Sequence, residues 1–356
     1  MSGKRIASQR TTLLYPAWGD DAMMKHKLSL TILSLAVALP ITALAHHSHS
    51  TINRDDVRIY SGVVTKYGWA MPHVYLKVKG PNDDGDVVEY SIEMGSPPSL
   101  VRRGWNRDTW KPGDRITWEG AHDRDPKRNY TGLKWAEKAD GTRVGNTVSS
   151  DEMPEPSADF SGLWSRSDPG GFKPHYRPPE GWPLSPLGKE LVDNFHEDQN
   201  PMVTCGNPGP PKSMIVPYPV KFSRPDANTL VMEREMMEDL RVVHFDRDHE
   251  VGEPSKMGHS VGWFEGDTLV VETNNFVADK WGIHTGISSS EKKHLVEKFT
   301  LSNGGLNLAA EIIVTDPVYL SEPKTFSHHW RKLVDRDVVQ APCTMEAAML
   351  YLEGGH

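Results

Sequence analysis

Short apolar segments with turn residues between them fill most of the second half of the chain. From residue 215 onward they lie near 215–222, 229–234, 240–245, 260–264, 268–273, 295–301, 306–314 and 326–333. Glu265-Gly266-Asp267 and Asn303-Gly304-Gly305 have the composition of hairpin turns. Many short strands joined in this way are typical of antiparallel barrels and sandwiches. We therefore expect residues 160–356 to form a larger antiparallel β-barrel, lipocalin-like, or a β-sandwich.

The first half of the chain also has strand character, but in a different order. Segments 63–67, 73–78 and 87–92 are predicted strands, 96–104 is a short helix that Ser96 caps, and 113–119 and 131–137 are two more strands. Three strands, a short helix and two strands is the order of an OB-fold. We expect an all-β protein with an OB-like five-stranded β-barrel over residues 46–147 and a Ser/Pro/acidic linker over residues 148–159.

The N-terminal segment has the pattern of a secretory signal peptide. Lys25-His26-Lys27 precedes the apolar run Leu28–Leu39, and Ala43-Leu44-Ala45 follows as a cleavage site. The run is too short for a transmembrane helix. We expect residues 1–45 to be removed, with Met23 or Met24 as a more natural start than Met1. The mature protein is then periplasmic or secreted, without stable membrane insertion.

Charge and missing motifs exclude several functional classes. Lys and Arg number 40 against 48 Asp and Glu, which gives a net charge of −8. There is no basic surplus to attract nucleic acid, so we expect no nucleic-acid partner. The sequence also has no Walker-type phosphate loop, no Cys-x-x-Cys and no His-Glu-x-x-His. Readings as a nucleotide hydrolase, a haem-attachment protein or a zinc peptidase therefore lose their main support.

The chain has two cysteines, Cys205 and Cys343. In an oxidising compartment an even pair indicates one disulfide, the alternative being two free buried thiols. We predict the disulfide.

Motifs in both halves resemble families of bacterial proteins without an assigned function. The first domain resembles a family of secreted proteins through His46-His47-Ser48, Pro72-His73-Val74, Glu93-Met94-Gly95-Ser96-Pro97 and Arg103-Gly104-Trp105. The second is similar to another uncharacterised family through Gly258-His259-Ser260-Val261-Gly262-Trp263-Phe264-Glu265-Gly266-Asp267-Thr268-Leu269-Val270-Val271, and its two cysteines match positions where that family carries cysteine. Gly162-Leu163-Trp164 is similar to the Gly-x-Trp opening of lipocalins. None of these resemblances implies an activity.

The mature N-terminus is a candidate metal site. Cleavage after Ala45 would free the α-amine of His46, which together with its own ring can chelate one copper ion. His47 and His73 are candidate further ligands. The alternative is a solvated polar tail.

The second domain holds the candidate site for a small molecule. His259 and Glu265 are a candidate catalytic acid/base pair. Strand alternation puts His259 and Trp263 on one face, where we expect them to line the barrel cavity. Candidate ligand-binding residues are Arg241, His244, Trp263 and Asp267. The alternative is that Glu265 and Asp267 are polar only because they occupy a hairpin tip.

These features favour a two-domain protein that binds a small molecule or a metal ion. The alternative is a periplasmic enzyme, either a copper protein that uses His46 or a lyase, isomerase or hydrolase that uses His259 and Glu265. A purely structural protein of the cell envelope is the third class.

Overall fold

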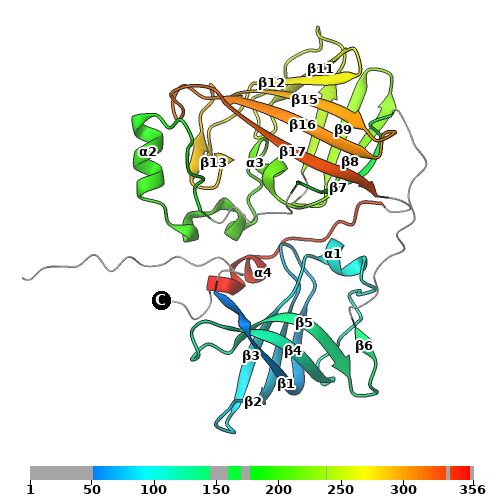
Figure 1. The fold of residues 1–356 in the computed structure, drawn as a ribbon, viewed down its shortest axis with the longest axis vertical. Coiled ribbons are helices and arrows are strands. Elements are labelled where there is room, and N and C mark those ends of the chain that lie inside the picture. Colours follow the sequence, from blue (N-terminus) through cyan, green and yellow to red (C-terminus); the bar gives the residue numbers. More distant parts are fainter. Residues whose placement is uncertain (1–50, 145–158, 170–176, 238, 334–336, 353–356) are drawn as a thin grey trace, which may run out of the picture. The chain divides into compact units, whose positions relative to one another are not determined.

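The computed structural model describes residues 51–144, 159–169, 177–237, 239–333 and 337–352 (Figure 1). The predicted signal peptide, His46, His47 and the predicted linker up to residue 158 lie outside these described residues. The structure is almost entirely β, as the sequence predicts, with two separate strand systems. No helix in the described ranges is both long and apolar enough to cross a membrane.

The first strand system has the strand order expected of an OB-like barrel. Its strands are β1 (Ile52–Gly68), β2 (Tyr75–Pro81), β3 (Val87–Glu93), β4 (Arg115–Asp123), β5 (Tyr130–Lys138) and β6 (Arg143–Val144). β1 pairs with β2 and β4, β2 with β3, and β4 with β5, all antiparallel. A parallel pairing of β3 with β5 closes the ring of five, and β6 extends β5 at its far edge.

The short helix of this domain lies between β3 and β4, where the sequence places it. Helix α1 (Pro97–Val101) begins after Ser96, whose side chain accepts a hydrogen bond from the Ser99 amide. Inside the ring, Tyr60 stacks on Trp118 with ring centroids 5.0 Å apart. Trp105 and Trp110 are also buried in this core, so these tryptophans of the first domain serve packing.

The second strand system is a closed barrel of nine strands. These are β7 (Gly162–Arg166), β8 (Val220–Asp226), β9 (Thr229–Arg234), β10 (Leu240–His244), β11 (His259–Glu265), β12 (Thr268–Asn274), β15 (His294–Ser302), β16 (Asn307–Thr315) and β17 (Lys324–Leu333). β15, β16 and β17 follow one another along one wall of the barrel (Figure 1). Neighbouring strands are antiparallel except β10 and β11, which are parallel. The barrel alternative is therefore confirmed.

Near one end of the barrel, apolar side chains pack around Trp164. The Trp164 side chain is fully buried, and its Nε1 donates a hydrogen bond of 2.8 Å to the carbonyl of Phe160. Lys332 on β17 lies over the indole, with Nζ 5.1 Å from the ring centroid. Phe222 and Phe299 continue this core inside the barrel.

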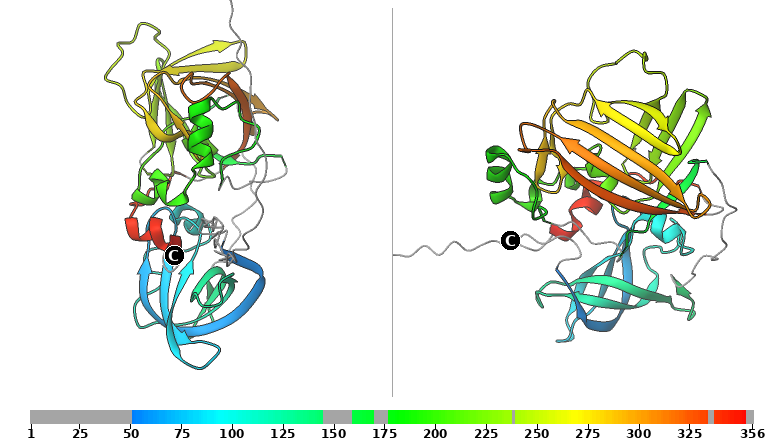
Figure 2. Two further views of the ribbon diagram at one scale, coloured as in Figure 1. Left: turned by 90° about the vertical axis from the view of Figure 1, so that its left-hand side faces the viewer. Right: turned by 45° about the horizontal axis from the view of Figure 1, so that its top comes forward.

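The other end carries short elements that strand periodicity does not predict. They are α2 (Pro186–Asp193), η1 (Glu197–Gln199), η2 (Pro201–Thr204), α3 (Lys212–Ile215), β13 (Asp279–His284) and β14 (Ile287–Ser289). Helix α2 begins after Ser185, as predicted, and lies outside the barrel wall in Figure 1 and in the right-hand view of Figure 2. The predicted strand at 215–222 is wrong in its first half. Pro217 and Pro219 cannot donate ladder hydrogen bonds, so the strand begins only at Val220.

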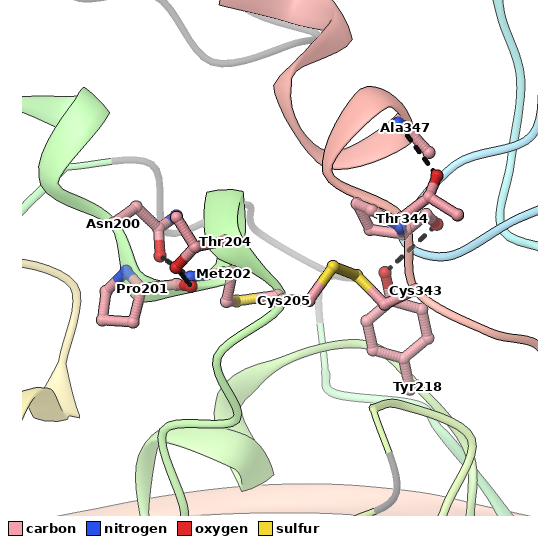
Figure 3. The surroundings of a disulfide bond; sticks show 10 residues. Asn200, Pro201, Met202, Thr204, Cys205, Tyr218, Cys343, Thr344 and Ala347 are labelled. Atoms are coloured by element: carbon pink, nitrogen blue, oxygen red, sulfur yellow. Dashed lines mark hydrogen bonds between the residues drawn. A yellow bond between two sulfur atoms is a disulfide. The ribbon is translucent and has the colours of Figure 1, made fainter.

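The predicted disulfide between Cys205 and Cys343 is present. It joins the end of η2 to the segment before α4 (Met345–Met349) and η3 (Leu350–Leu352), with Cα atoms 5.8 Å apart (Figure 3). Thr344 caps α4 by accepting a hydrogen bond from the amide of Ala347. The same C-terminal segment contacts β1 and the residues after it, since Met71 exchanges backbone hydrogen bonds with Pro342 and Thr344.

Candidate functional site

The face of β11 that carries His259 and Trp263 points away from the barrel interior. Ser260 is 1% exposed, and a Cβ atom on Gly262 would lie 2.8 Å from a side-chain carbon of the core residue Val243. Ser260 and Gly262 therefore face inward. The prediction that His259 and Trp263 line the barrel cavity is wrong.

The two residues of the predicted acid/base pair are also too far apart to act together. His259 and Glu265 are six residues apart on one extended strand, which places their Cα atoms roughly 20 Å apart. Glu265 instead accepts a hydrogen bond of 3.0 Å from Trp263 Nε1, and Arg247 covers that indole at 4.3 Å. Asp267 is exposed at the hairpin tip. These side chains form a surface patch and cannot act on one substrate atom together with His259.

His259 instead lies in a cluster of three imidazoles on the outer surface. The ring centroids of His244 and His249 are 3.5 Å apart, and those of His259 lie 5.5 and 5.9 Å from them. Partial burial lowers the pKa of His244 and of His259, and the neighbouring imidazoles lower both further. Both shifts favour the neutral imidazole, which keeps one nitrogen lone pair.

Arg241 points the opposite way and lies inside the barrel. Its guanidinium forms an ion pair with Glu297 on β15, and it donates hydrogen bonds to Ser260 Oγ (2.9 Å) and Thr273 Oγ1 (2.6 Å). All four residues are at most 4% exposed. Glu297 Oε1 has no hydrogen-bond partner in the described part of the chain. Arg241 and His244 were predicted to share a ligand site, but they lie on opposite sides of the barrel wall.

The stretch Gly258-His259-Ser260-Val261-Gly262 has the Gly-x-Ser-x-Gly spacing of a hydrolase nucleophile elbow. That motif requires a sharp turn between a strand and a helix, with an exposed serine hydroxyl. Here Ser260 lies within a strand, is buried, and bonds to Arg241 and Thr273. His259, its only histidine neighbour in sequence, faces the other way. The motif is therefore structural in this chain.

Two buried lysines lie at the barrel end that β13, β14 and α3 cover. Lys212 Nζ donates to Thr285 Oγ1 at 2.6 Å, and Lys293 Nζ donates to the Pro210 carbonyl at 2.8 Å and lies 4.0 Å from the centre of the Phe276 ring. Burial lowers the pKa of each amine to about 7. Sequence reasoning missed both lysines, because nothing in their local pattern marks them as buried.

Replacing Lys212 with methionine should make the protein less sensitive to pH. The pKa of this lysine is about 7 when folded and near 10.5 when unfolded, so between these values the unfolded chain binds more protons. The free energy of unfolding therefore rises with pH in this window, by up to about 1.4 kcal/mol per unit for one such lysine. Lys212→Met should be more stable than the wild type at pH 7 and lose this rise.

Urea unfolding at pH 7 and pH 9.5 measures the difference. The exposed Lys280 on β13 provides the matched control, because Lys280→Met should leave the pH dependence unchanged. An equal effect of both substitutions would show that burial of Lys212 is not the cause.

A cavity opens at the apolar end of the barrel, next to the hairpin tips. Its volume is about 470 Å³, and its lining consists of Asp159, Phe160, Arg224, Leu230, Phe245, Phe264 and Leu269. This volume is within the range of about 300–1,000 Å³ common for small-molecule pockets. Five of the seven lining residues are apolar, and the two others carry opposite charges.

Aromatic rings form one wall of this cavity. Phe245 and Phe264 stack with ring centroids 5.8 Å apart and an angle of 7°, and Phe160 lies 6.0 Å from Phe264. Arg224 covers Phe245 at 4.6 Å, and Phe264 is 47% exposed. Sequence reasoning missed these residues, although Phe264 lies next to Trp263 in the motif considered. The sequence gives only their spacing, which puts Phe264 on the same strand face as Ser260 and Gly262.

In the first domain, His73 lies beside a buried carboxylate. Its Nδ1 is 3.0 Å from the Met94 carbonyl and 3.4 Å from Glu93 Oε1, and Tyr130 donates a hydrogen bond to the other oxygen of Glu93. Glu93 and Met94 belong to the Glu-Met-Gly-Ser-Pro motif, so two separate motifs meet here.

The copper chelate stays a prediction. His46 and His47 lie outside the described residues, and His73 is the one predicted ligand whose position is known. Within the described ranges, no three His, Cys, Asp or Glu side chains are arranged as a ready-made metal site.

The comparisons with known proteins reach only the first domain. A family model described as "Family of unknown function (DUF6152)" matches residues 33–134. The match includes the Pro-His-Val, Glu-Met-Gly-Ser-Pro and Arg-Gly-Trp motifs, which agrees with the predicted resemblance to an uncharacterised family. The comparison with curated proteins found no match, and neither did the comparison with solved structures. The first domain is therefore similar to a family whose description assigns no activity.

Proposed function

We propose that the nine-stranded barrel binds a small apolar or aromatic molecule that carries an anionic group. The observation that supports this most strongly is the cavity of about 470 Å³ with three phenylalanines in its lining. Stacked rings present a flat apolar wall, which favours planar ligands.

Arg224 provides the polar end of the proposed site. Its guanidinium lies over Phe245, and one nitrogen donates to the Ala227 carbonyl at 2.6 Å. The planar guanidinium has five donors, so others remain for a carboxylate or sulfonate. Asp159 on the lining disfavours a ligand with two or more negative charges. The favoured class is therefore an aromatic or aliphatic molecule with one acidic group.

The aromatic sulfonate dye 8-anilinonaphthalene-1-sulfonate is a suitable probe. It should bind one site on the folded protein, with a rise in fluorescence. Arg224→Glu should weaken binding about tenfold, because it removes the charge-assisted contact and adds repulsion, a change on the order of 1.4 kcal/mol. Phe264→Ala should also weaken binding, since it removes an aromatic wall whose loss costs little in core packing.

Arg247 provides a closely matched control. It too covers an aromatic ring, at 4.3 Å from Trp263, but on the outer face of β11 and outside the cavity lining. Arg247→Glu should leave dye binding unchanged. Equal weakening by Arg224→Glu and Arg247→Glu would contradict the proposal. Partly unfolded protein also binds this dye, so the unfolding midpoint of each variant is measured to check that its fold is intact.

A further inference from the structure

The barrel has one short strand pairing, between β10 and β11, which we call the β10–β11 seam. In the described chain, these two parallel strands pair only through Val243 with Ser260 and His244 with Val261. Each other pair of neighbouring barrel strands is joined by at least three residue pairs. The seam is therefore where the barrel wall opens most readily, because it has the fewest paired residues to separate.

The seam also borders the cavity proposed to bind a ligand. Beyond the paired residues, the two strands meet through the side chains of Phe245 and Phe264, whose ring centroids are 5.8 Å apart. Both residues line the cavity. Phe245 directly follows His244, the last residue of β10, so a displacement of His244 also moves this aromatic wall. Opening of the seam separates two rings that a planar ligand would contact.

Three imidazoles lie across the outer face of the seam. His244 ends β10, His259 begins β11, and His249 lies in the connection between the two strands. Their ring centroids are 3.5, 5.5 and 5.9 Å apart, and the rings are nearly parallel, with interplanar angles of 12°, 16° and 8°. Neutral rings in this arrangement attract one another by dispersion, whereas protonated rings at these distances repel. Protonation of the cluster therefore acts directly on the seam.

Nearby carboxylates offset this repulsion only in part. Burial and the two other imidazoles lower the pKa of His244, against the opposite effect of Asp226 at the end of β8 and Asp246 in the connection. Burial and His249 lower the pKa of His259. Both histidines thus bind a proton less readily in the closed seam than as free side chains.

The other groups around the cluster are uncharged, paired or exposed to solvent. β9 presents Thr229 opposite His244, and β12 presents Asn274 opposite His259. Glu272, two residues before Asn274, forms an ion pair with His294 on β15. The remaining charged side chains of the connection are exposed, so water and salt screen them; they are Arg247, Asp248, Glu250, Glu253 and Lys256.

We propose that the cluster of His244, His249 and His259 makes ligand binding in the cavity dependent on pH. Neutral rings leave the seam closed, whereas protons taken up in acid drive the rings apart and separate Phe245 from Phe264. This inference rests on the proposed function, because the cavity is the site that the cluster regulates. The open seam binds protons more readily, so affinity should be constant above about pH 7 and fall below the ordinary imidazole pKa of about 6.5.

Binding of 8-anilinonaphthalene-1-sulfonate to the full chain at pH 7.5 and pH 5.5 tests this dependence. The sulfonate stays ionised at both values, so its own charge does not change. The dissociation constant of the wild type should be about threefold or more higher at pH 5.5. The double variant His249→Gln/His259→Gln leaves one imidazole on the seam. It should bind like the wild type at pH 7.5 and lose most of the rise, whereas His294→Gln on β15 should keep it.

Hydrogen exchange without the dye separates failure of this inference from failure of the proposed function. After correction for the intrinsic effect of pH on exchange, peptides that cover β10 and β11 should exchange faster at pH 5.5 than at pH 7.5, relative to peptides from β16. The double variant should not show this difference. Absence of dye binding at pH 7.5 would contradict the proposed function. Equal exchange of the seam at both pH values, or an undiminished rise of the dissociation constant in the double variant, would overturn the pH dependence.

Discussion

Replacing Glu297 with glutamine should lower the free energy of unfolding by about 3–5 kcal/mol. The substitution removes the carboxylate that pairs with Arg241 inside the barrel and leaves the buried guanidinium without that opposite charge. Glutamine has nearly the same volume as glutamate, so the substitution creates no cavity. The loss of stability therefore reports the loss of the charge. Equilibrium unfolding in guanidinium chloride, followed by tryptophan fluorescence and circular dichroism, gives the difference.

The double variant Arg241→Met/Glu297→Leu should be markedly more stable than Glu297→Gln alone. Apolar side chains of similar size remove both charges, and such replacement of a buried pair is often neutral or stabilising. Ser260 and Thr273 keep their mutual hydrogen bond of 2.9 Å in that variant.

The exposed pair Lys189 and Asp193 on α2 is the matched control, because Asp193→Asn should change stability by less than about 1 kcal/mol. A Glu297→Gln effect of the same small size would show that the guanidinium is compensated by its hydroxyl partners.

The sequence predicts the strands of this protein better than it predicts their faces. Turn residues such as Gly266 and Gly304 mark where strands end, and their positive φ angles in the structure agree with that role. Which face of a strand is inside depends on the neighbours that barrel closure brings together. No local pattern contains that information.

Strand β11 shows why the prediction of the inner face was wrong. Val261 and Trp263 are more apolar than Ser260 and Gly262, so hydrophobic alternation favours the wrong face as the inner one. The inner face accepts small residues because Arg241 lies against Ser260 and bonds to it, and Val243 and Phe245 lie against Gly262. A charged residue inside a barrel thus reverses the usual pattern, and the candidate site derived from it moves to the surface.

The disulfide was predictable from the cysteine number and the predicted oxidising compartment, whereas its consequences depend on the fold. Replacing both Cys205 and Cys343 with serine should lower the free energy of unfolding by about 4–5 kcal/mol in the chain-entropy estimate for a loop of 138 residues. The disulfide restricts the conformations of the unfolded chain, because it joins residues that flank most of the barrel in the sequence. Urea unfolding of the double variant against the wild type measures the loss.

The structure also predicts which segment should unfold first when the disulfide is removed. The C-terminal segment contributes Ala347 and Leu350 to a small core with Ile52 and Tyr75, and Lys66 pairs with Glu346 at its edge. Without the bridge, the segment is held by these contacts, by the backbone hydrogen bonds to Met71 and, at its start, by polar contacts with Lys221 and with residues 233–235. Limited proteolysis should therefore cut near residues 337–352 in the double variant before it cuts the barrel strands.

Wild-type protein treated with a reducing agent is the control for the serine substitutions, and it should show the same proteolytic pattern and the same midpoint. A double variant within about 1 kcal/mol of the wild type, with an uncut C-terminal segment, would contradict the entropic account. Stability would then come from the apolar contacts of Ala347 and Leu350, and Leu350→Ala should produce the proteolytic pattern instead.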